Sequence, residues 1–156
     1  MVAAMMIAAA DVGFVSAADA PWVEAGEGVQ LRVFRVDLDR GLWVIGNRFA
    51  PGFSTPIHRH TGEVNAFTLS GSWYYKEYGV QYTAGSYVYE PANSVHTLCV
   101  SESNTETTEV IFTIDGALVY TAADGAVLGI ADGAGTLAAY LAMCEQQGHG
   151  TPGTLR

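Results

Sequence analysis

Short runs in which apolar and polar residues alternate recur along most of the chain, and turn residues separate them. Because the side chains of a strand point alternately to its two faces, this pattern predicts β-strands with one face turned to a core. The predicted strands are Val29 to Val36, Gly41 to Phe49, Val64 to Leu69, Ser72 to Tyr78, Tyr87 to Glu90, His96 to Val100, Val110 to Ile114, Ala117 to Tyr120 and Val127 to Ile130. The alternation slips by one residue at Val33-Phe34, which predicts a β-bulge.

Glycine and asparagine mark the predicted turns. Ser70-Gly71 and Asp115-Gly116 each separate two predicted strands, and we interpret both as hairpin turns. Asn93 lies in the turn that begins at Pro91, and asparagine tolerates the left-handed backbone conformation better than most residues. Many short strands with frequent turns favour an antiparallel barrel of two sheets.

One helix is expected, near the end of the chain. Apolar residues recur there at helical spacing, at Leu137, Tyr140, Leu141 and Cys144. Thr136 is the predicted N-cap and Gly148 the predicted end, so the helix is assigned to residues 136–147. Because no repeat or linker is visible, residues 1–156 are interpreted as one domain.

Composition limits the partners that the chain can have. It has a formal net charge of −9, with 49% hydrophobic and 15% charged residues. A surface that binds nucleic acid must neutralise phosphates, so this charge argues against nucleic acid and, for the same reason, against anionic membranes. Cys99 and Cys144 are the only cysteines. They are too few for a disulfide framework, and we expect free thiols and a cytoplasmic location.

The first twenty residues, Met1 to Ala20, are rich in Ala, Met and Val. We expect no secretory signal, because a basic region is lacking and Asp11 interrupts the apolar run. No stretch reaches the roughly 20 apolar residues that a membrane span needs. We expect instead an apolar arm that packs on its own subunit or on a partner. Such an arm could be swapped between protomers of the homodimer or homotetramer that we expect.

Two glycine-bounded stretches carry three histidines. The first, Gly52 to Gly71, contains His58 and His60, whose spacing places both imidazoles on one face of a strand. The second, Gly85 to His96, supplies a third imidazole from a distant part of the chain. Three converging imidazoles would form a metal site, and this ligand type suits iron, zinc, copper or nickel.

These two stretches resemble the two conserved motifs of the cupins. The resemblance implies an all-β fold, the cupin double-stranded β-helix or jelly-roll barrel, here with a short C-terminal helix. Many cupins add a glutamate ligand shortly after the His-x-His pair, but Val64 or Asn65 occupies that position here. Glu63 lies one residue away and should point to the other face. We therefore predict a site of three neutral histidines with no acid among the ligands.

The resemblance extends beyond the motifs. The run from His58 to Tyr75, and that from Ala84 to Leu98, are similar to the 2,4'-dihydroxyacetophenone dioxygenase group of cupins. That group and the related acetylacetone-cleaving dioxygenase use iron(II) on three histidines to split a carbon–carbon bond with dioxygen. The resemblance thus implies metal binding by His58, His60 and His96. The expected cofactor is Fe(II), although a preparation could carry Zn or Ni, and the expected partners are a small-molecule substrate and O2.

Glu90 is the candidate catalytic residue. It lies six positions before His96, and the diketone-cleaving relative has a glutamate at the same offset. Three roles stay open at this point. The carboxylate could accept the free N–H of a ligand histidine, take a proton from the substrate as a general base, or anchor the turn at Pro91.

Weaker candidates surround these residues. An aromatic set lies on the strands that flank the site and could line a pocket or pack in the core: Trp73, Tyr74, Tyr75, Tyr78, Tyr87 and Tyr89. Asn65 could orient a substrate oxygen and Lys76 could attract an anionic substrate, whereas a solvated lysine is the simpler interpretation. His149 is interpreted as a tail residue.

Three functions follow from these features. The leading hypothesis is iron(II)-dependent oxidative cleavage of an aromatic hydroxyketone or a β-diketone. The second is a zinc-binding sensor or regulatory module, because the chain also resembles the sensor domains of some anti-sigma factors and zinc cannot exchange electrons with dioxygen. The third is an isomerase or hydrolase that uses the metal as a Lewis acid only.

Overall fold

The structure is a computed structural model, and it describes residues 11–156. Antiparallel strands are the main regular structure of these residues, and one helix follows them. The part of the predicted N-terminal arm before Asp11 lies outside the described residues. In the described part of the arm, Val12 and Phe14 are exposed and Ala20 is buried. Within the described residues, no helix is long and apolar enough to cross a membrane.

The strands form three sheets. The largest has the order β1-β2-β3-β11-β5-β8 and consists of β1 (Val23–Gly26), β2 (Val29–Asp37), β3 (Leu42–Phe49), β11 (Thr108–Asp115), β5 (Val64–Ser70) and β8 (Tyr87–Glu90). The second has the order β13-β12-β4-β9 and consists of β13 (Val127–Asp132), β12 (Ala117–Thr121), β4 (His58–His60) and β9 (Val95–His96). The third has the order β10-β6-β7 and consists of β10 (Leu98–Cys99), β6 (Ser72–Tyr75) and β7 (Gln81–Thr83).

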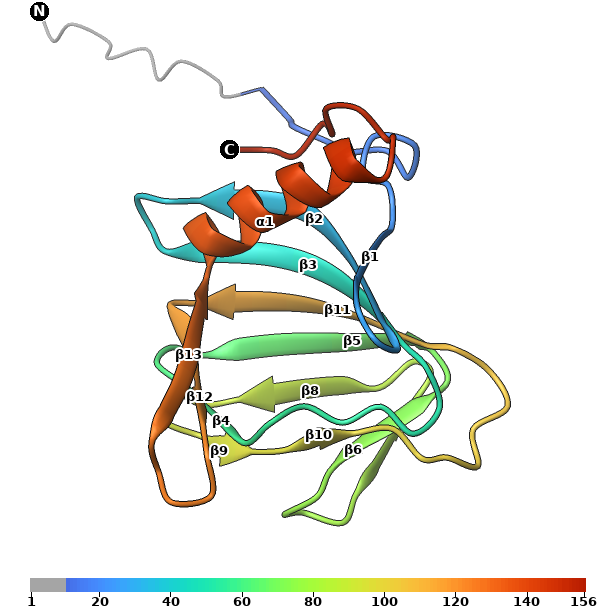
Figure 1. Ribbon diagram of the computed structural model, residues 1–156, viewed down its shortest axis with the longest axis vertical. Coiled ribbons are helices and arrows are strands. Elements are labelled where there is room, and N and C mark those ends of the chain that lie inside the picture. Colours follow the sequence, from blue (N-terminus) through green and yellow to red (C-terminus); the bar gives the residue numbers. More distant parts are fainter. Residues whose placement is uncertain (1–10) are drawn as a thin grey trace, which may run out of the picture.

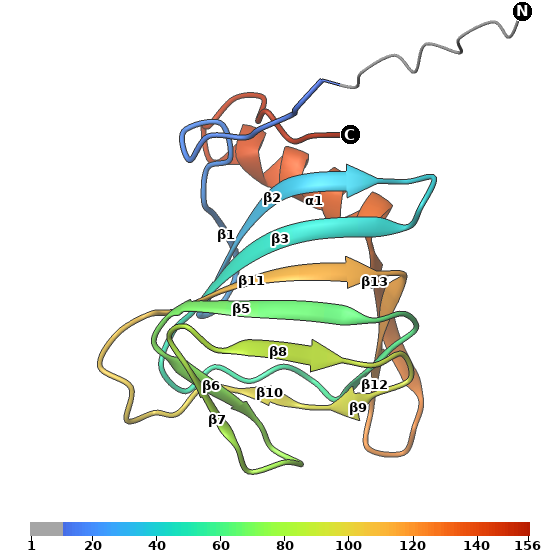
Figure 2. The same cartoon turned by 180° about the vertical axis from the view of Figure 1, so that it is seen from behind.

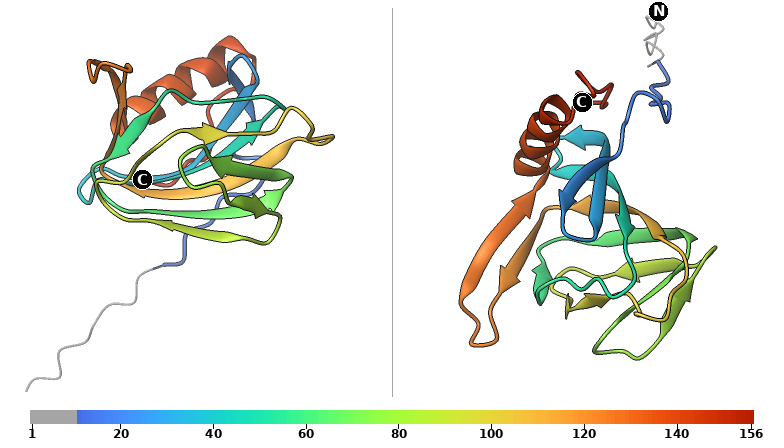
Figure 3. Two further views of the ribbon diagram at one scale, coloured as in Figure 1. Left: turned by 90° about the horizontal axis from the view of Figure 1, so that it is seen from below. Right: turned by 45° about the vertical axis from the view of Figure 1, so that its right-hand side comes forward.

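The six-stranded sheet forms one wall of the molecule, and the two smaller sheets lie across it (Figures 1 and 2). The hairpin of β12 and β13 projects from the body below the start of helix α1 (Gly133–Gln146), as the right-hand view of Figure 3 shows. The result is the all-β barrel with a short C-terminal helix that the sequence predicts.

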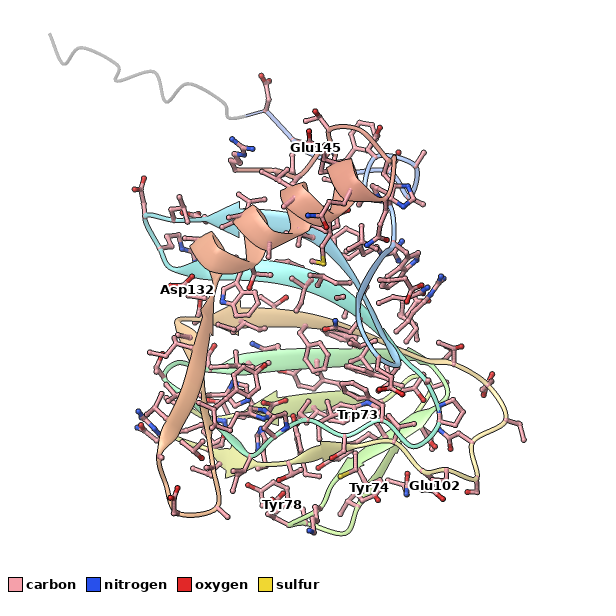
Figure 4. The ribbon with its side chains drawn as sticks, in the orientation of Figure 1. Trp73, Tyr74, Tyr78, Glu102, Asp132 and Glu145 are labelled. Carbon is pink, nitrogen blue, oxygen red and sulfur yellow. The ribbon has the colours of Figure 1, made fainter. Side chains whose placement is uncertain are left out.

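Alternation along the strands explains where the core lies. In β11 the residues alternate strictly between buried and half-buried, and Val110, Phe112 and Ile114 face inward. Trp73 of β6 is fully buried against Phe112 from the opposite side. Figure 4 shows Trp73 among the strands and Tyr78 at the lower edge of the molecule. The core therefore fills the space between the sheets, which is also where the functional site must lie.

Two predicted hairpins are wrong, although their strands are present. Across Ser70-Gly71, β5 pairs with β11 and β8, whereas β6 pairs with β7 and β10. Across Asp115-Gly116, β11 pairs with β3 and β5, whereas β12 pairs with β13 and β4. Both tight turns move the chain from one sheet to another. Local turn chemistry specifies a reversal of direction but not the strand with which the next segment pairs.

Of the other local predictions, the bulge and the turn at Asn93 are confirmed, and one strand is divided. The register between β2 and β3 shifts between Val33 and Arg35, which is the predicted bulge. Asn93 has a φ of 67°, as its place in the turn requires. The predicted strand from His96 to Val100 is instead divided, because its residues pair with β4 and then with β6.

The helix begins earlier than predicted. Asp132, not Thr136, is its N-cap, and the Asp132 side chain accepts a hydrogen bond of 2.7 Å from the backbone N–H of Gly135. The labelled Asp132 lies at the junction of β13 and α1 (Figure 4). Periodicity missed this start because the first turn, Gly133 to Gly135, contains no large apolar residue.

We expect Asp132→Ala to lower the free energy of unfolding by about 1 kcal/mol, the usual cost of removing an N-cap side chain. The matched control is Thr136→Ala at the position that the sequence predicted. It should change stability by less than about 0.5 kcal/mol, since Thr136 makes no capping bond. Urea unfolding of both variants measures the difference, and an equal loss in the two would contradict the assignment of the cap.

Candidate metal centre

Three histidines converge between the sheets. His58 and His60 lie on β4 with the exposed Arg59 between them, so that both imidazoles point inward. The neighbouring strand β9 places His96 directly opposite His58 in the antiparallel register. The three ring centroids are each 5.0 Å from the other two. One candidate ligand nitrogen from each ring lies within 4.8 Å of the others, so the three histidines are positioned for metal binding.

Hydrogen bonds fix the backbone and one ring of this cluster. The Nδ1 atom of His58 lies 3.1 Å from the carbonyl oxygen of Pro56, which fits an Nδ1–H donor and leaves Nε2 free as a ligand. The backbone of His60 is tied to the β8–β9 turn twice, by bonds from Asn93 N–H to its oxygen and from its N–H to the oxygen of Ser94. The turn after Glu90 thus sets the position of both strands that carry the three histidines.

Burial keeps the imidazole of His58 neutral. His58, His60 and His96 are between 1% and 4% exposed. Burial lowers the pKa of His58 to about 4, and the nearby His60 and His96 lower it further, whereas the contact with the Pro56 carbonyl opposes the shift. A metal ligand must be deprotonated, and a neutral imidazole near pH 7 meets that condition.

Glu90 lies beside the histidines, on the other sheet. On β8 it pairs with Val64 of β5, so the two side chains face inward side by side. Its Oε2 atom is 2.8 Å from Nε2 of His60 and 3.2 Å from Nε2 of His96. Its Oε1 atom accepts a hydrogen bond from the hydroxyl group of Tyr75. The structure thus brings the carboxylate to the ligand nitrogens themselves.

The charge on Glu90 is stabilised by its neighbours. Burial alone would raise the pKa of its carboxyl, but the contacts with His60 and His96 and the hydrogen bond from Tyr75 outweigh it and lower the pKa to about 2. In turn, burial, and then the charge of Glu90 and the hydrogen bond to it, raise the pKa of the Tyr75 hydroxyl well above its usual value. Tyr75 therefore stays a neutral donor and Glu90 an anion.

The residues present fit a divalent metal ion. Nitrogen and oxygen atoms from His60, His96 and Glu90 crowd one point, and the Nε2 atoms of the two histidines are only 3.0 Å apart. Atoms with lone pairs repel at such distances unless protons or a cation lie between them. Imidazole and carboxylate ligands together suit iron or zinc, among other ions, so the donor set does not identify the metal.

A cavity of about 500 Å³ opens beside the cluster. His58, His60 and Glu90 line it together with Tyr75 and Tyr120. Most of its remaining wall is apolar and comes from β2, β3, β11 and the β12–β13 hairpin, for example Leu31, Ile45, Phe112, Leu118 and Leu128. Small-molecule sites are concave and mostly apolar with a few polar groups, which is the arrangement here.

Several weaker candidates do not lie at the site. Asn65 is on the outer face of β5, where its side-chain oxygen accepts a hydrogen bond from Tyr87. Glu63 also points outward, as predicted, and contacts the hydroxyl group of Tyr89. Lys76 and His149 are exposed, which agrees with their simpler interpretations.

The aromatic set is divided between the interior and the surface. Trp73 and Tyr75 are buried, whereas Tyr78, Tyr87 and Tyr89 are each more than half exposed and Tyr74 is intermediate. Of the six, Tyr75 alone lines the cavity.

Sequence reasoning missed two neighbours of His58. Tyr120 pairs with it across β12 and β4, with ring centroids 5.5 Å apart. The hydroxyl group of Thr55 lies 3.4 Å from Nδ1 of His58 and accepts a bond from the backbone N–H of Leu98. No local signal marks Tyr120, because the pairing of β12 with β4 joins segments far apart in the chain.

The fold and this histidine cluster define a cupin. Residues 11–119 match the family of the ChrR Cupin-like domain, and the chain belongs to this family. Comparison with curated proteins finds no match.

Solved structures confirm the fold. The chain is similar to a cupin-like protein of unknown function from Ralstonia eutropha JMP134, with 35% identity over 92% of this chain and 91% of that one and a TM-score of 0.84. An acetylacetone dioxygenase from Acinetobacter johnsonii is 19% identical over 92% of this chain and 99% of that one, with a TM-score of 0.74. A complex of SigE with the anti-sigma factor ChrR from Rhodobacter sphaeroides gives 17% identity over 60% and 48%, with a TM-score of 0.51.

Proposed function

We propose that this protein is a non-haem iron(II)-dependent dioxygenase that cleaves a carbon–carbon bond of an aromatic hydroxyketone or a β-diketone with O2. The observation that carries the proposal is the convergence of three buried imidazoles beside an apolar cavity, with His58 and His60 on its wall. The likeness in fold to an acetylacetone dioxygenase supports it.

Each part of the site has a role in this proposal. His58, His60 and His96 would hold the ion, and bound iron(II) would supply the one-electron chemistry with dioxygen that zinc lacks. The apolar wall would hold the hydrocarbon part of the substrate and exclude water. Because imidazoles are neutral, the charge of the ion is available to attract a substrate bound as its enolate through two oxygens.

The cavity favours the larger of the two substrate classes. A volume of about 500 Å³ lies within the range of drug-sized ligand sites, roughly 300 to 1,000 Å³. An aromatic hydroxyketone would occupy more of it than acetylacetone, and the aliphatic and aromatic walls suit a ring. We therefore place the hydroxyketone first.

Glu90 stays the proposed catalytic residue, but its environment argues against one of the three roles that the sequence left open. A general base must reach the proton that it removes, and both oxygens of Glu90 are already in contact with Tyr75 or the two histidines. Its contacts with His60, His96 and Tyr75 favour a role at the metal centre instead.

A zinc-binding sensor is the second candidate. The match to the ChrR Cupin-like family favours it, and so does the carboxylate beside the histidines, since zinc is commonly held by four ligands of these types. A sensor would bind its ligand in the same cavity without consuming dioxygen.

Reconstitution of apoprotein with one metal at a time separates the two candidates. We expect the iron(II) form to consume oxygen when 2,4'-dihydroxyacetophenone is added, and more slowly with acetylacetone. The zinc form is the control and should consume none. The opposite result would be a protein that is purified with stoichiometric zinc and that consumes no oxygen with either substrate after exchange to iron(II). That result would refute the proposed dioxygenase activity and favour the sensor.

A further inference from the structure

The carboxylate of Glu90 lies among the ligand atoms of the histidine cluster, not behind them. A carboxylate that only orients a ligand histidine contacts the ring nitrogen remote from the metal. Here Oε2 is 2.8 Å and 3.2 Å from the Nε2 atoms of His60 and His96. The Nδ1 atoms of the same two rings are buried and have no hydrogen-bond partner among residues 11–156.

The contacts of Oε2 are close, but they are not aligned as hydrogen bonds. Within residues 11–156 this buried oxygen has no partner that meets hydrogen-bond geometry. The lone pairs of Oε2 and of the two Nε2 atoms can instead point to one position between these atoms, where a metal ion would bind. Ligands bound at right angles to an ion, with bonds of about 2.1 Å, are separated by about 3.0 Å. The separations of 2.8, 3.0 and 3.2 Å among these three atoms match that arrangement.

The neighbouring strands explain how a carboxylate reaches this point. Val64 or Asn65 occupies the position at which many cupins carry a glutamate ligand, and of the two Val64 faces inward and is fully buried. Glu90 is its direct partner across β5 and β8, on the same inner face. Side chains opposite each other on neighbouring strands lie about 5 Å apart at Cβ. The longer side chain of Glu90 can therefore present its carboxylate where a glutamate at position 64 would have presented one.

Tyr75 controls the orientation of this carboxylate. Its hydroxyl group donates a hydrogen bond to Oε1 of Glu90, so only Oε2 faces the histidines. Its ring stacks on His96, with centroids 3.7 Å apart and planes 19° apart. Tyr75 comes from β6, in the third sheet, and is 2% exposed. One side chain thus contacts both Glu90 and a histidine ligand and restrains their relative position.

We propose that Glu90 is a fourth ligand of the metal ion, bound through Oε2 alone, and that Tyr75 is the positioning residue that restricts it to one oxygen. This inference rests on the proposed three-histidine metal site and holds for an enzyme or a sensor. A Glu90 ligand would add one negative charge to the three neutral imidazoles. It therefore differs from the prediction made from the sequence, which had no acid among the ligands.

Cobalt(II) is a suitable probe, because its visible absorption reports the number and type of its ligands. We expect apoprotein to bind one equivalent of cobalt(II). Glu90→Gln should weaken this binding by about 100-fold or more, above the range of roughly 10 to 100-fold for residues that act through a ligand, and should change the cobalt spectrum. Tyr75→Phe keeps the stacked ring and removes the hydroxyl group. It should weaken binding about 10-fold and alter the spectrum.

The chain contains a matched control pair. The hydroxyl group of Tyr89, an exposed residue of β8, donates a hydrogen bond of 3.3 Å to Glu63, which directly precedes β5. Glu63→Gln and Tyr89→Phe therefore make the same chemical changes away from the cavity. Both variants should leave the affinity for cobalt and its spectrum within twofold of the wild type.

Two results would overturn the inference. A cobalt spectrum that is unchanged in Glu90→Gln would show that the carboxylate is not a ligand, even if affinity falls. A crystal structure of the cobalt-loaded wild type supplies the test without a variant. It should place Oε2 about 2.0 to 2.2 Å from the ion, and a separation beyond about 3.5 Å would refute coordination. Wild-type protein that binds neither cobalt nor zinc would instead sink the proposed metal site itself.

Discussion

His96→Ala is expected to abolish stoichiometric metal binding. His96 is 1% exposed, lies opposite His58 in the strand register and has its Nε2 atom 3.0 Å from that of His60. Removing it leaves His58, His60 and the proposed ligand Glu90, an incomplete set that should hold an ion far more weakly. Metal analysis after equilibrium dialysis against one equivalent of iron(II) or zinc measures the loss, which we expect to exceed 100-fold in affinity.

The fourth histidine provides the control for that experiment. His149 is exposed in the tail that follows α1, so His149→Ala removes an imidazole without touching the cluster. It should keep one equivalent of metal. If His96→Ala also kept a full equivalent, the assignment of the ligands would be wrong, and the cluster would be a set of buried core histidines.

Gly71→Ala is expected to lower the free energy of unfolding by about 3 kcal/mol. Gly71 has a φ of +69°, in the left-handed region that disfavours a side chain. A Cβ atom there would lie 2.4 Å from Oγ1 and 2.7 Å from Cα of Thr108, a residue that is fully buried. Strain of about 1 to 2 kcal/mol and overpacking of about 1 to 3 kcal/mol together predict a loss of about 3 kcal/mol.

Gly79→Ala separates the two causes. Gly79 has a φ of +63°, but no atom lies within 4 Å of the position that its Cβ would occupy. It should therefore show the conformational cost alone, about 1 kcal/mol. Thermal unfolding of the two variants compares them, with a shift of about 2 to 4 °C expected for each kcal/mol in a chain of this length. Equal shifts would show that Thr108 moves aside without cost.

The three candidate histidines could be picked out because local sequence marks each of them. The spacing of His58 and His60 fixes their common face once β4 is a strand, and the turn from Pro91 to Ser94 precedes His96 at a characteristic distance. The bulge in β2 and the left-handed Asn93 were predicted for the same reason. Each requires only the conformational preferences of a few consecutive residues.

The surroundings of the histidines could not be predicted in this way. Glu90 was singled out, but its contacts with the Nε2 atoms of His60 and His96 depend on the pairing of β8 with β5 and of β4 with β9. Tyr75 was one of six aromatic candidates, and its place beside His96 depends on the assignment of β6 to a third sheet. The hydrogen bond between Tyr75 and Glu90 forms only because β6 and β8, which belong to different sheets, both face the site.

The sequence by itself determined the all-β class, most of the strands and the three histidines, because strand periodicity and ligand spacing are properties of neighbouring residues. Only the tertiary structure decided that the turns at Gly71 and Gly116 change sheets, and that a carboxylate stands with the imidazoles. Those outcomes depend on which distant strands pair, and pairing is set by burial of the whole inner face and not by any one turn.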